Sequence, residues 1–129
     1  MSAKNMSLFQ QMYKNISEQN YIDAFKDCDA GFTFQIMGKS KCAGKFNAST
    51  LTESYFLKQK SLSQNTISIE VHDVLASDLH ATVLATVRLK KDNQSIEYRT
   101  VHVWRIQGGK PVAGYEYPRD LYQYDLIWS

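Results

Sequence analysis

Apolar and polar residues alternate over the longest uninterrupted distance between Gln94 and Asp120. The alternation predicts two antiparallel strands with a turn at Gly108-Gly109, because neighbouring side chains of a strand point to opposite faces. One face of the first strand collects the residues Ile96, Tyr98, Thr100, His102, Trp104 and Ile106. An apolar face with a few polar groups is typical of the wall of a small-molecule pocket, so we expect a pocket there.

Helical spacing of apolar residues predicts three helices in the first half of the chain. The first runs from Ser7 to Glu18 and begins with a capping box formed by Ser7 and Gln10. A shorter helix follows a cap at Asn20. Its inner residues are Ile22, Phe25 and Cys28. The third helix begins with a capping box at Thr50. Its inner residues are Leu51, Tyr55, Lys58 and Leu62.

Strand patterns account for the remainder of the chain. Residues Phe32–Met37 form one short strand, and the chain from Thr66 onward reads as four long strands joined by short turns. Helices first and an antiparallel meander last predict an α+β fold. At 129 residues, the chain is expected to form a single domain over residues 1–129, in which a curved antiparallel sheet wraps around the N-terminal helices.

The second face of the sheet is mixed rather than polar. The apolar residues assigned to it are Val74, Leu84, Val101, Val103 and Val112. A face that met only solvent would be mostly polar, so we expect it to pack against a second copy of the chain in a homodimer.

Charge and composition narrow the classes of partner. The net charge is +2 and the longest basic run is Lys90-Lys91, so the basic patch of a nucleic-acid-binding protein is missing. No apolar stretch approaches the ~20 residues of a membrane span. The first residues, MSAKNMSLFQQMYK, lack an apolar secretory segment, which predicts a cytoplasmic protein. Cys28 and Cys42 are then expected as reduced thiols, and their surroundings in sequence predict no metal site.

The order of elements resembles that of the SnoaL-like and ketosteroid-isomerase-like superfamily, which has the nuclear-transport-factor-like fold. The resemblance rests on the strand that ends in Gly38, on Gly44 six residues later, on the capped helix, and on the closing meander GGKPVAGYEYPRDLYQYDLIW. It covers essentially the whole chain. It implies a cone-shaped, cystatin-like α+β barrel with one deep pocket and no cofactor, and it indicates a fold more strongly than an activity.

The resemblance also implies roles for individual positions. Tyr13 matches the tyrosine that donates a hydrogen bond to the substrate oxygen in ketosteroid isomerases, and His102 matches the acidic partner of that tyrosine. The position of the general base holds Gln35, and an amide takes up no proton at neutral pH. The Asp-Arg-Asp set of the epoxide-hydrolase branch is absent, because the last strand reads Tyr115-Glu116-Tyr117.

We therefore take His102 and Tyr13 as candidate catalytic residues, because histidine exchanges protons near neutrality and tyrosine can polarise a carbonyl group. The candidate ligand-binding residues are Gln35, Met37, Tyr55, Tyr98, Thr100, Trp104 and Tyr117. This set assumes that Tyr117 faces inward and Glu116 outward. A register shifted by one residue would instead make Glu116 a pocket acid. Each of these histidine and aromatic side chains has an alternative role as part of the core.

Two functions follow from the pocket. The first is cofactor-free acid/base catalysis, namely isomerisation, cyclisation or dehydration of an apolar carbonyl compound. The second is non-catalytic binding of a small apolar ligand, which is favoured by the missing general base and by a histidine without a charged partner in the sequence pattern. A protein-interaction domain of the same fold is a third, lower-ranked alternative.

Overall fold

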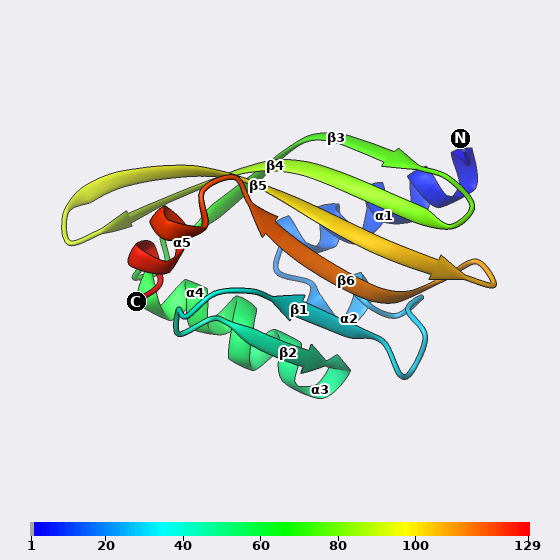
Figure 1. Ribbon diagram of the computed structural model, residues 1–129, viewed down its shortest axis with the longest axis horizontal. Coiled ribbons are helices and arrows are strands. Elements are labelled where there is room, and N and C mark those ends of the chain that lie inside the picture. Colours follow the sequence, from blue (N-terminus) through cyan, green and yellow to red (C-terminus); the bar gives the residue numbers. More distant parts are fainter. Residues whose placement is uncertain (1) are drawn as a thin grey trace.

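Figure 1 shows the arrangement of helices and strands in a computed structural model, which describes residues 2–129. The helical segments are α1 (Ala3–Ser17), α2 (Tyr21–Ala24), α3 (Ala48–Leu51), the π-helical turn η1 (Thr52–Phe56), α4 (Leu57–Leu62) and α5 (Leu121–Ile127). The strands are β1 (Thr33–Ile36), β2 (Gly44–Asn47), β3 (Ser68–Ala76), β4 (His80–Lys91), β5 (Gln94–Gln107) and β6 (Lys110–Pro118).

The strands form one curved sheet in the order β2-β1-β6-β5-β4-β3 (Figure 1). Neighbouring strands are antiparallel except β1 and β6, which are parallel. Helix α1 lies along β3 and β4, and α3 follows β2. Helix residues and the inner side chains of the strands form one apolar core. The predicted α+β fold, with N-terminal helices against a curved sheet, is confirmed.

Two-residue turns join the longest strands. Gly108 and Gly109 connect β5 to β6 with φ angles of 60° and 77°, so the predicted turn is confirmed. Asp92 and Asn93 connect β4 to β5 with φ angles of 54° and 64°. Positive φ at both central residues matches the right-handed twist of the flanking strands, and glycine, asparagine and aspartate tolerate it best.

The predicted helix boundaries require correction. Helix α1 starts at Ala3, and its cap is Ser2, whose hydroxyl accepts a hydrogen bond from the backbone N–H of Asn5 at 3.1 Å. Ser7 therefore lies inside the helix. Helix α2 is a single turn, and Ile22, predicted to be an inner residue, is 91% exposed. Ala24 is the buried residue of this turn.

A register shift in β3 reverses the predicted faces of its second half. The pairing with β4 skips one residue between Val71 and Asp73, so the side chains beyond this bulge change sides. Val74, assigned to the outer face from the sequence, is 5% exposed and lies in the core. Leu75 is 44% exposed. Strict alternation predicted the opposite, because a sequence pattern does not reveal a bulge.

The third predicted helix contains a π-helical turn. It begins at Asn47, whose side chain caps it, rather than at Thr50. Leu51 and Tyr55 are buried as predicted, but the wider turn of η1 moves the following inward positions along by one residue. The buried residues beyond the turn are Gln59 and Ser63 instead of Lys58 and Leu62.

Gly114 lets β1 and β6 approach each other. It pairs with Phe34 on β1 and with Trp104 on β5, and both aromatic rings lie over it. A Cβ atom at this position would lie 2.4 Å from the Phe34 ring and 2.9 Å from the Trp104 ring. The absent side chain therefore makes room for two of the largest core residues.

Gly114→Ala should lower the free energy of unfolding by about 1–3 kcal/mol, because the added methyl group overpacks a closed part of the core. Urea denaturation of the purified variants measures the change. Gly31→Ala serves as a control, since a Cβ there meets only the flexible side chain of Asp29 at 3.3 Å. Equal effects of the two substitutions would contradict this account of Gly114.

Candidate functional site

His102 lies in the middle of β5 and points into the core, as the alternation predicts. It is 4% exposed and sits between Val83 on β4 and Glu116 on β6. The Nε2 atom of His102 lies 3.1 Å from a carboxylate oxygen of Glu116. The histidine therefore has a buried acidic partner, which the predicted orientation of Glu116 did not provide.

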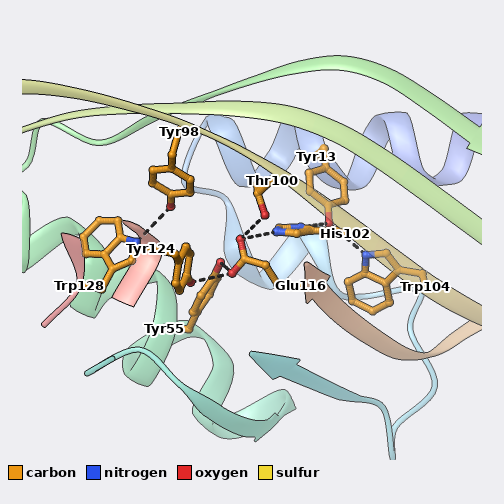
Figure 2. A network of polar contacts seen from close by, with 9 residues as sticks. All are labelled: Tyr13, Tyr55, Tyr98, Thr100, His102, Trp104, Glu116, Tyr124 and Trp128. Carbon is orange, nitrogen blue, oxygen red and sulfur yellow. Dashed lines mark hydrogen bonds and ion pairs between the residues drawn. The ribbon is translucent and has the colours of Figure 1, made fainter. Parts of the chain in front are cut away.

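The carboxylate of Glu116 is surrounded by hydrogen-bond donors (Figure 2). Its Oε1 atom accepts hydrogen bonds from the hydroxyls of Tyr55 and Tyr124 at 2.8 and 2.7 Å. Its Oε2 atom accepts one from Thr100 at 2.8 Å and interacts with His102. Two contacts on each oxygen use the acceptor capacity of an ionised carboxylate, so this carboxylate is suited to holding neighbouring groups in place.

Tyr13 of α1 continues this network on the other side of the imidazole ring. Its hydroxyl lies 2.6 Å from the Nδ1 atom of His102 and accepts a hydrogen bond from the indole N–H of Trp104 at 3.0 Å. The chain of contacts thus runs from Trp104 through Tyr13 and His102 to Glu116 (Figure 2). These residues come from α1, β5 and β6.

The hydrogen positions in this chain depend on the charge of His102. Because Glu116 accepts from Nε2, the neutral imidazole carries its hydrogen on Nε2 and accepts the hydrogen of Tyr13 on Nδ1. A protonated imidazole donates from both nitrogens. The Tyr13 oxygen then accepts from Trp104 and from His102, and its own hydrogen is released for another acceptor.

The protein environment sets the charge states of Glu116 and Tyr13, the two side chains that contact the ring nitrogens of His102. Burial alone would raise the pKa of Glu116, but the adjacent His102 and the hydrogen bonds from His102, Tyr124 and Tyr55 outweigh it, and the pKa lies below its usual value. Burial raises the pKa of Tyr13 far above its usual value. Near neutral pH, Glu116 is therefore ionised, and Tyr13 keeps its proton and can act as a hydrogen-bond donor.

A cavity of about 60 Å³ lies beside the network. Its buried lining residues with polar groups are Tyr13, Tyr55, Gln59, Tyr98, His102 and Glu116. Its more exposed lining residues include Ser17, Gln19, Tyr21, Phe56, Lys60 and Ser68. Small-molecule pockets usually hold about 300–1,000 Å³. A ligand as large as a substituted benzene would therefore have to extend through the mouth toward solvent.

Most of the predicted site residues come together. Tyr13, His102, Tyr55 and Tyr98 line the cavity. Thr100 and Trp104 contact Glu116 and Tyr13 respectively. The hydroxyl of Tyr98 accepts a hydrogen bond from the indole of Trp128 at 3.1 Å and so belongs to a separate pair at the same cavity.

Three predicted ligand-binding residues lie elsewhere. Gln35 is half-buried beside Tyr115 on the outer face, since its neighbours Phe34 and Ile36 occupy the inner one. Met37 is 47% exposed beyond the end of β1, and Tyr117 is 52% exposed. The assumed register of β6 is wrong: Glu116 is the inward residue at 1% exposure, and the tyrosines on either side of it face outward.

Sequence reasoning missed three further residues of the site. Tyr124 and Trp128 belong to α5 and its cap, where the prediction continued with strand. Their four-residue spacing and the capping residue Asp120 were helical signals. Gln59 was missed because η1 moves the inward positions by one residue. The spacing of apolar residues in a sequence does not indicate where a π-helical turn occurs.

Comparisons with known proteins identify the fold. No protein-family model matches the sequence, and no curated protein sequence matches it. Bal32a, from a soil-derived mobile gene cassette, is similar with a TM-score of 0.86 and 16% identity, over 98% of this chain and 97% of that chain. An NTF2-like protein from Burkholderia thailandensis has a TM-score of 0.83 and 16% identity, over 98% of both chains.

TerC, co-crystallized with polyporic acid, has a TM-score of 0.80 and 13% identity, over 98% of this chain and all of that chain (100%). These likenesses show that the protein has the NTF2-like fold. The fold implied by the resemblance to the SnoaL-like and ketosteroid-isomerase-like superfamily is confirmed. Among residues 2–129, no helix combines the length and the apolar character that crossing a membrane requires.

Glu116→Gln should lower the free energy of unfolding at pH 7 by about 3 kcal/mol, because it breaks a buried pair and presents an amide N–H₂ to groups that donate. The pKa of Glu116 is lowered by folding, so its ionised form stabilises the fold above its ordinary pKa of about 4.3, and that stability is lost as the pH falls through the folded value. Thermal unfolding between pH 3 and pH 7 should therefore show a weaker acid dependence in the variant.

Glu97→Gln is the matched control for this measurement. Its side chain is 53% exposed and pairs with Arg88 at 3.2 Å on the surface, where an ion pair contributes at most about 1 kcal/mol. An acid dependence of Glu116→Gln as steep as that of the unaltered protein would contradict the assigned charge of Glu116.

Proposed function

We propose that the protein binds a small apolar carbonyl compound in this cavity and catalyses acid/base chemistry on it without a cofactor. The observation that carries the proposal is the position of Tyr13, which lines the cavity and whose hydroxyl contacts Nδ1 of His102 at 2.6 Å. A hydroxyl held between a ligand site and a titratable imidazole can pass a proton between them.

The proposed step begins with His102 protonated and Tyr13 donating a hydrogen bond to the carbonyl oxygen of the ligand. As the O–H bond of Tyr13 breaks, the carbonyl oxygen gains that proton. The Nδ1–H bond of His102 breaks in turn and restores the Tyr13 hydroxyl. Water takes a proton from the carbon next to the carbonyl and becomes hydronium, and the electron pair of that C–H bond forms the C=C bond of the enol. The proton of the hydronium ion then returns to the neutral His102 through solvent and Tyr13. Isomerisation, cyclisation and dehydration of carbonyl compounds share such an intermediate.

Glu116 has a supporting role in this proposal. Its four contacts and its lowered pKa leave little capacity to accept a proton from a ligand. A buried carboxylate at 3.1 Å instead fixes the ring orientation of His102 and accepts from its Nε2–H. This buried partner removes one of the two grounds for the non-catalytic alternative, namely a histidine without a charged partner.

The fold neighbours are compatible with a small ligand. TerC was co-crystallized with polyporic acid, so one protein of this fold has been crystallized with a small organic molecule. The apolar side chains lining the present cavity are Ile16, Phe56, Ile67, Ile69 and Val87. They suit the apolar part of a carbonyl compound.

Propiophenone in D₂O provides a direct test. The unaltered protein should accelerate the exchange of the hydrogens next to the carbonyl for deuterium, and Tyr13→Phe should lower the protein-dependent rate by about 10²–10⁴-fold, because the hydroxyl that transfers the proton is gone. Proton NMR follows the exchange. Chemical-shift changes of the backbone amides in matched samples in H₂O report whether propiophenone is bound.

Tyr98→Phe controls for the loss of a buried hydroxyl. Like Tyr13, Tyr98 lines the cavity and accepts from an indole N–H, so its removal should reduce the melting temperature by a similar amount. It should reduce exchange far less, because Tyr98 does not contact His102. Binding of propiophenone without any acceleration of exchange would refute catalysis and favour the ligand-binding alternative.

We also propose that the outer face of the sheet forms a homodimer. Leu84, Val101 and Tyr117 lie side by side across β4, β5 and β6, and an apolar row at the centre of a sheet is a suitable contact between two copies. Residue Val74 no longer supports this proposal, since it lies in the core.

Light scattering at micromolar concentration should give the mass of a dimer for the unaltered protein and of a monomer for Val101→Lys, because a buried lysine would oppose the contact. Lys110→Glu, at the exposed hairpin end, should remain dimeric. A monomeric unaltered protein would exclude the proposed dimer.

A further inference from the structure

Gln59 on α4 has a polar group that the network does not use. The residue is 4% exposed and lines the same cavity as Tyr13 and His102. Within residues 2–129, its Nε2 atom is buried and has no hydrogen-bond partner. More than about 90% of buried polar groups in proteins have a partner, and an unsatisfied one is destabilising. Such a group calls for an explanation.

The inward direction of Gln59 results from the local backbone. The π-helical turn η1 lies directly before α4, and beyond it Gln59 rather than Lys58 faces the core. A π-helical turn is a departure from the regular helix that often occurs at functional sites. The same turn holds Tyr55, whose hydroxyl contacts Glu116. One irregular turn thus supplies both a network residue and the unpaired amide.

The other deep polar groups of the cavity already have partners. Tyr55 donates to Glu116, and Tyr98 accepts from Trp128. Nearer the mouth, the ammonium group of Lys60 donates to the side chain of Gln19 at 2.7 Å. Gln59 is therefore a residue of the cavity lining whose amide N–H₂ has no partner, separate from the donor that Tyr13 offers when His102 is protonated.

We propose that Gln59 determines ligand specificity by donating a hydrogen bond from Nε2 to a second acceptor oxygen of the ligand. The inference rests on the proposed function, in which Tyr13 binds the first oxygen. It narrows the ligand class from apolar monocarbonyl compounds to compounds with two oxygen acceptors, such as diketones. A buried donor discriminates strongly against a ligand that cannot satisfy it.

Two matched pairs of compounds test this role. Acetylbenzoyl differs from propiophenone, and benzoylacetone from butyrophenone, by one carbonyl group in place of a methylene group. NMR titration should show at least one diketone binding the unaltered protein about tenfold more tightly than its monoketone, which corresponds to one additional hydrogen bond. Gln59→Met should remove that gain and leave monoketone binding within about twofold, because methionine keeps the length of the side chain without the amide.

The ligand-free stability provides a second readout. Gln59→Met should leave the melting temperature equal or raise it, since it removes an unsatisfied buried amide. A substantial decrease would reveal a structural partner of Gln59 and overturn the proposal. The exposed Gln123→Met serves as a control for the substitution itself and should change neither binding nor stability.

The outcomes separate the inference from the function on which it rests. If the monoketones bind but neither diketone binds more tightly, or if the gain persists in Gln59→Met, the role of Gln59 is refuted and the carbonyl pocket stands. If none of the four compounds binds, the proposed pocket function fails together with the role of Gln59.

Discussion

The ionised carboxylate of Glu116 in the apolar interior is the constraint on which the rest of the site depends. An unpaired charge at 1% exposure would be very costly, so the fold must bring donors to it. These donors come from β5, from the π-helical turn η1 and from α5, and α1 joins the network through Tyr13. Segments far apart in the sequence thus meet at one carboxylate, which links the integrity of the site to the packing of α1, η1, β5, β6 and α5.

The features that the sequence revealed are those with a regular period. Alternation along β5 correctly placed His102 and its neighbours on the inner face, and the Gly108-Gly109 turn followed from local backbone preferences. The features that the sequence did not predict are those where the regular spacing of inward-facing residues is shifted by one residue. The bulge in β3 moved Val74 into the core, the true register of β6 turned Glu116 inward, and η1 brought in Gln59. Tertiary packing decides such one-residue shifts, and no local pattern encodes them.

The resemblance to known proteins predicted the fold more completely than it predicted the site. It located Tyr13 and His102 correctly beside each other, because those positions are fixed by the architecture of helix and sheet. It led to Gln35 as a pocket residue, although the pleat of β1 turns that side chain outward. The acidic partner of His102 comes instead from β6. The resemblance therefore does not supply the full set of titratable groups, and the chemistry must be inferred from the contacts themselves.

The π-helical turn behaves as a single inserted residue whose effect reaches across the cavity. Deleting one residue from Thr52–Phe56 would remove the extra residue, restore a regular helix and leave Gln59 facing inward. If the same sequence instead formed a regular helix at full length, everything after the turn would be rotated by roughly a quarter of a turn, since each helical residue accounts for about 100°. Lys58 would then take the inward place of Gln59 and carry its charge toward a wall that already holds His102 beside Glu116. The composition of the cavity wall thus depends on the local helix geometry as much as on residue identity.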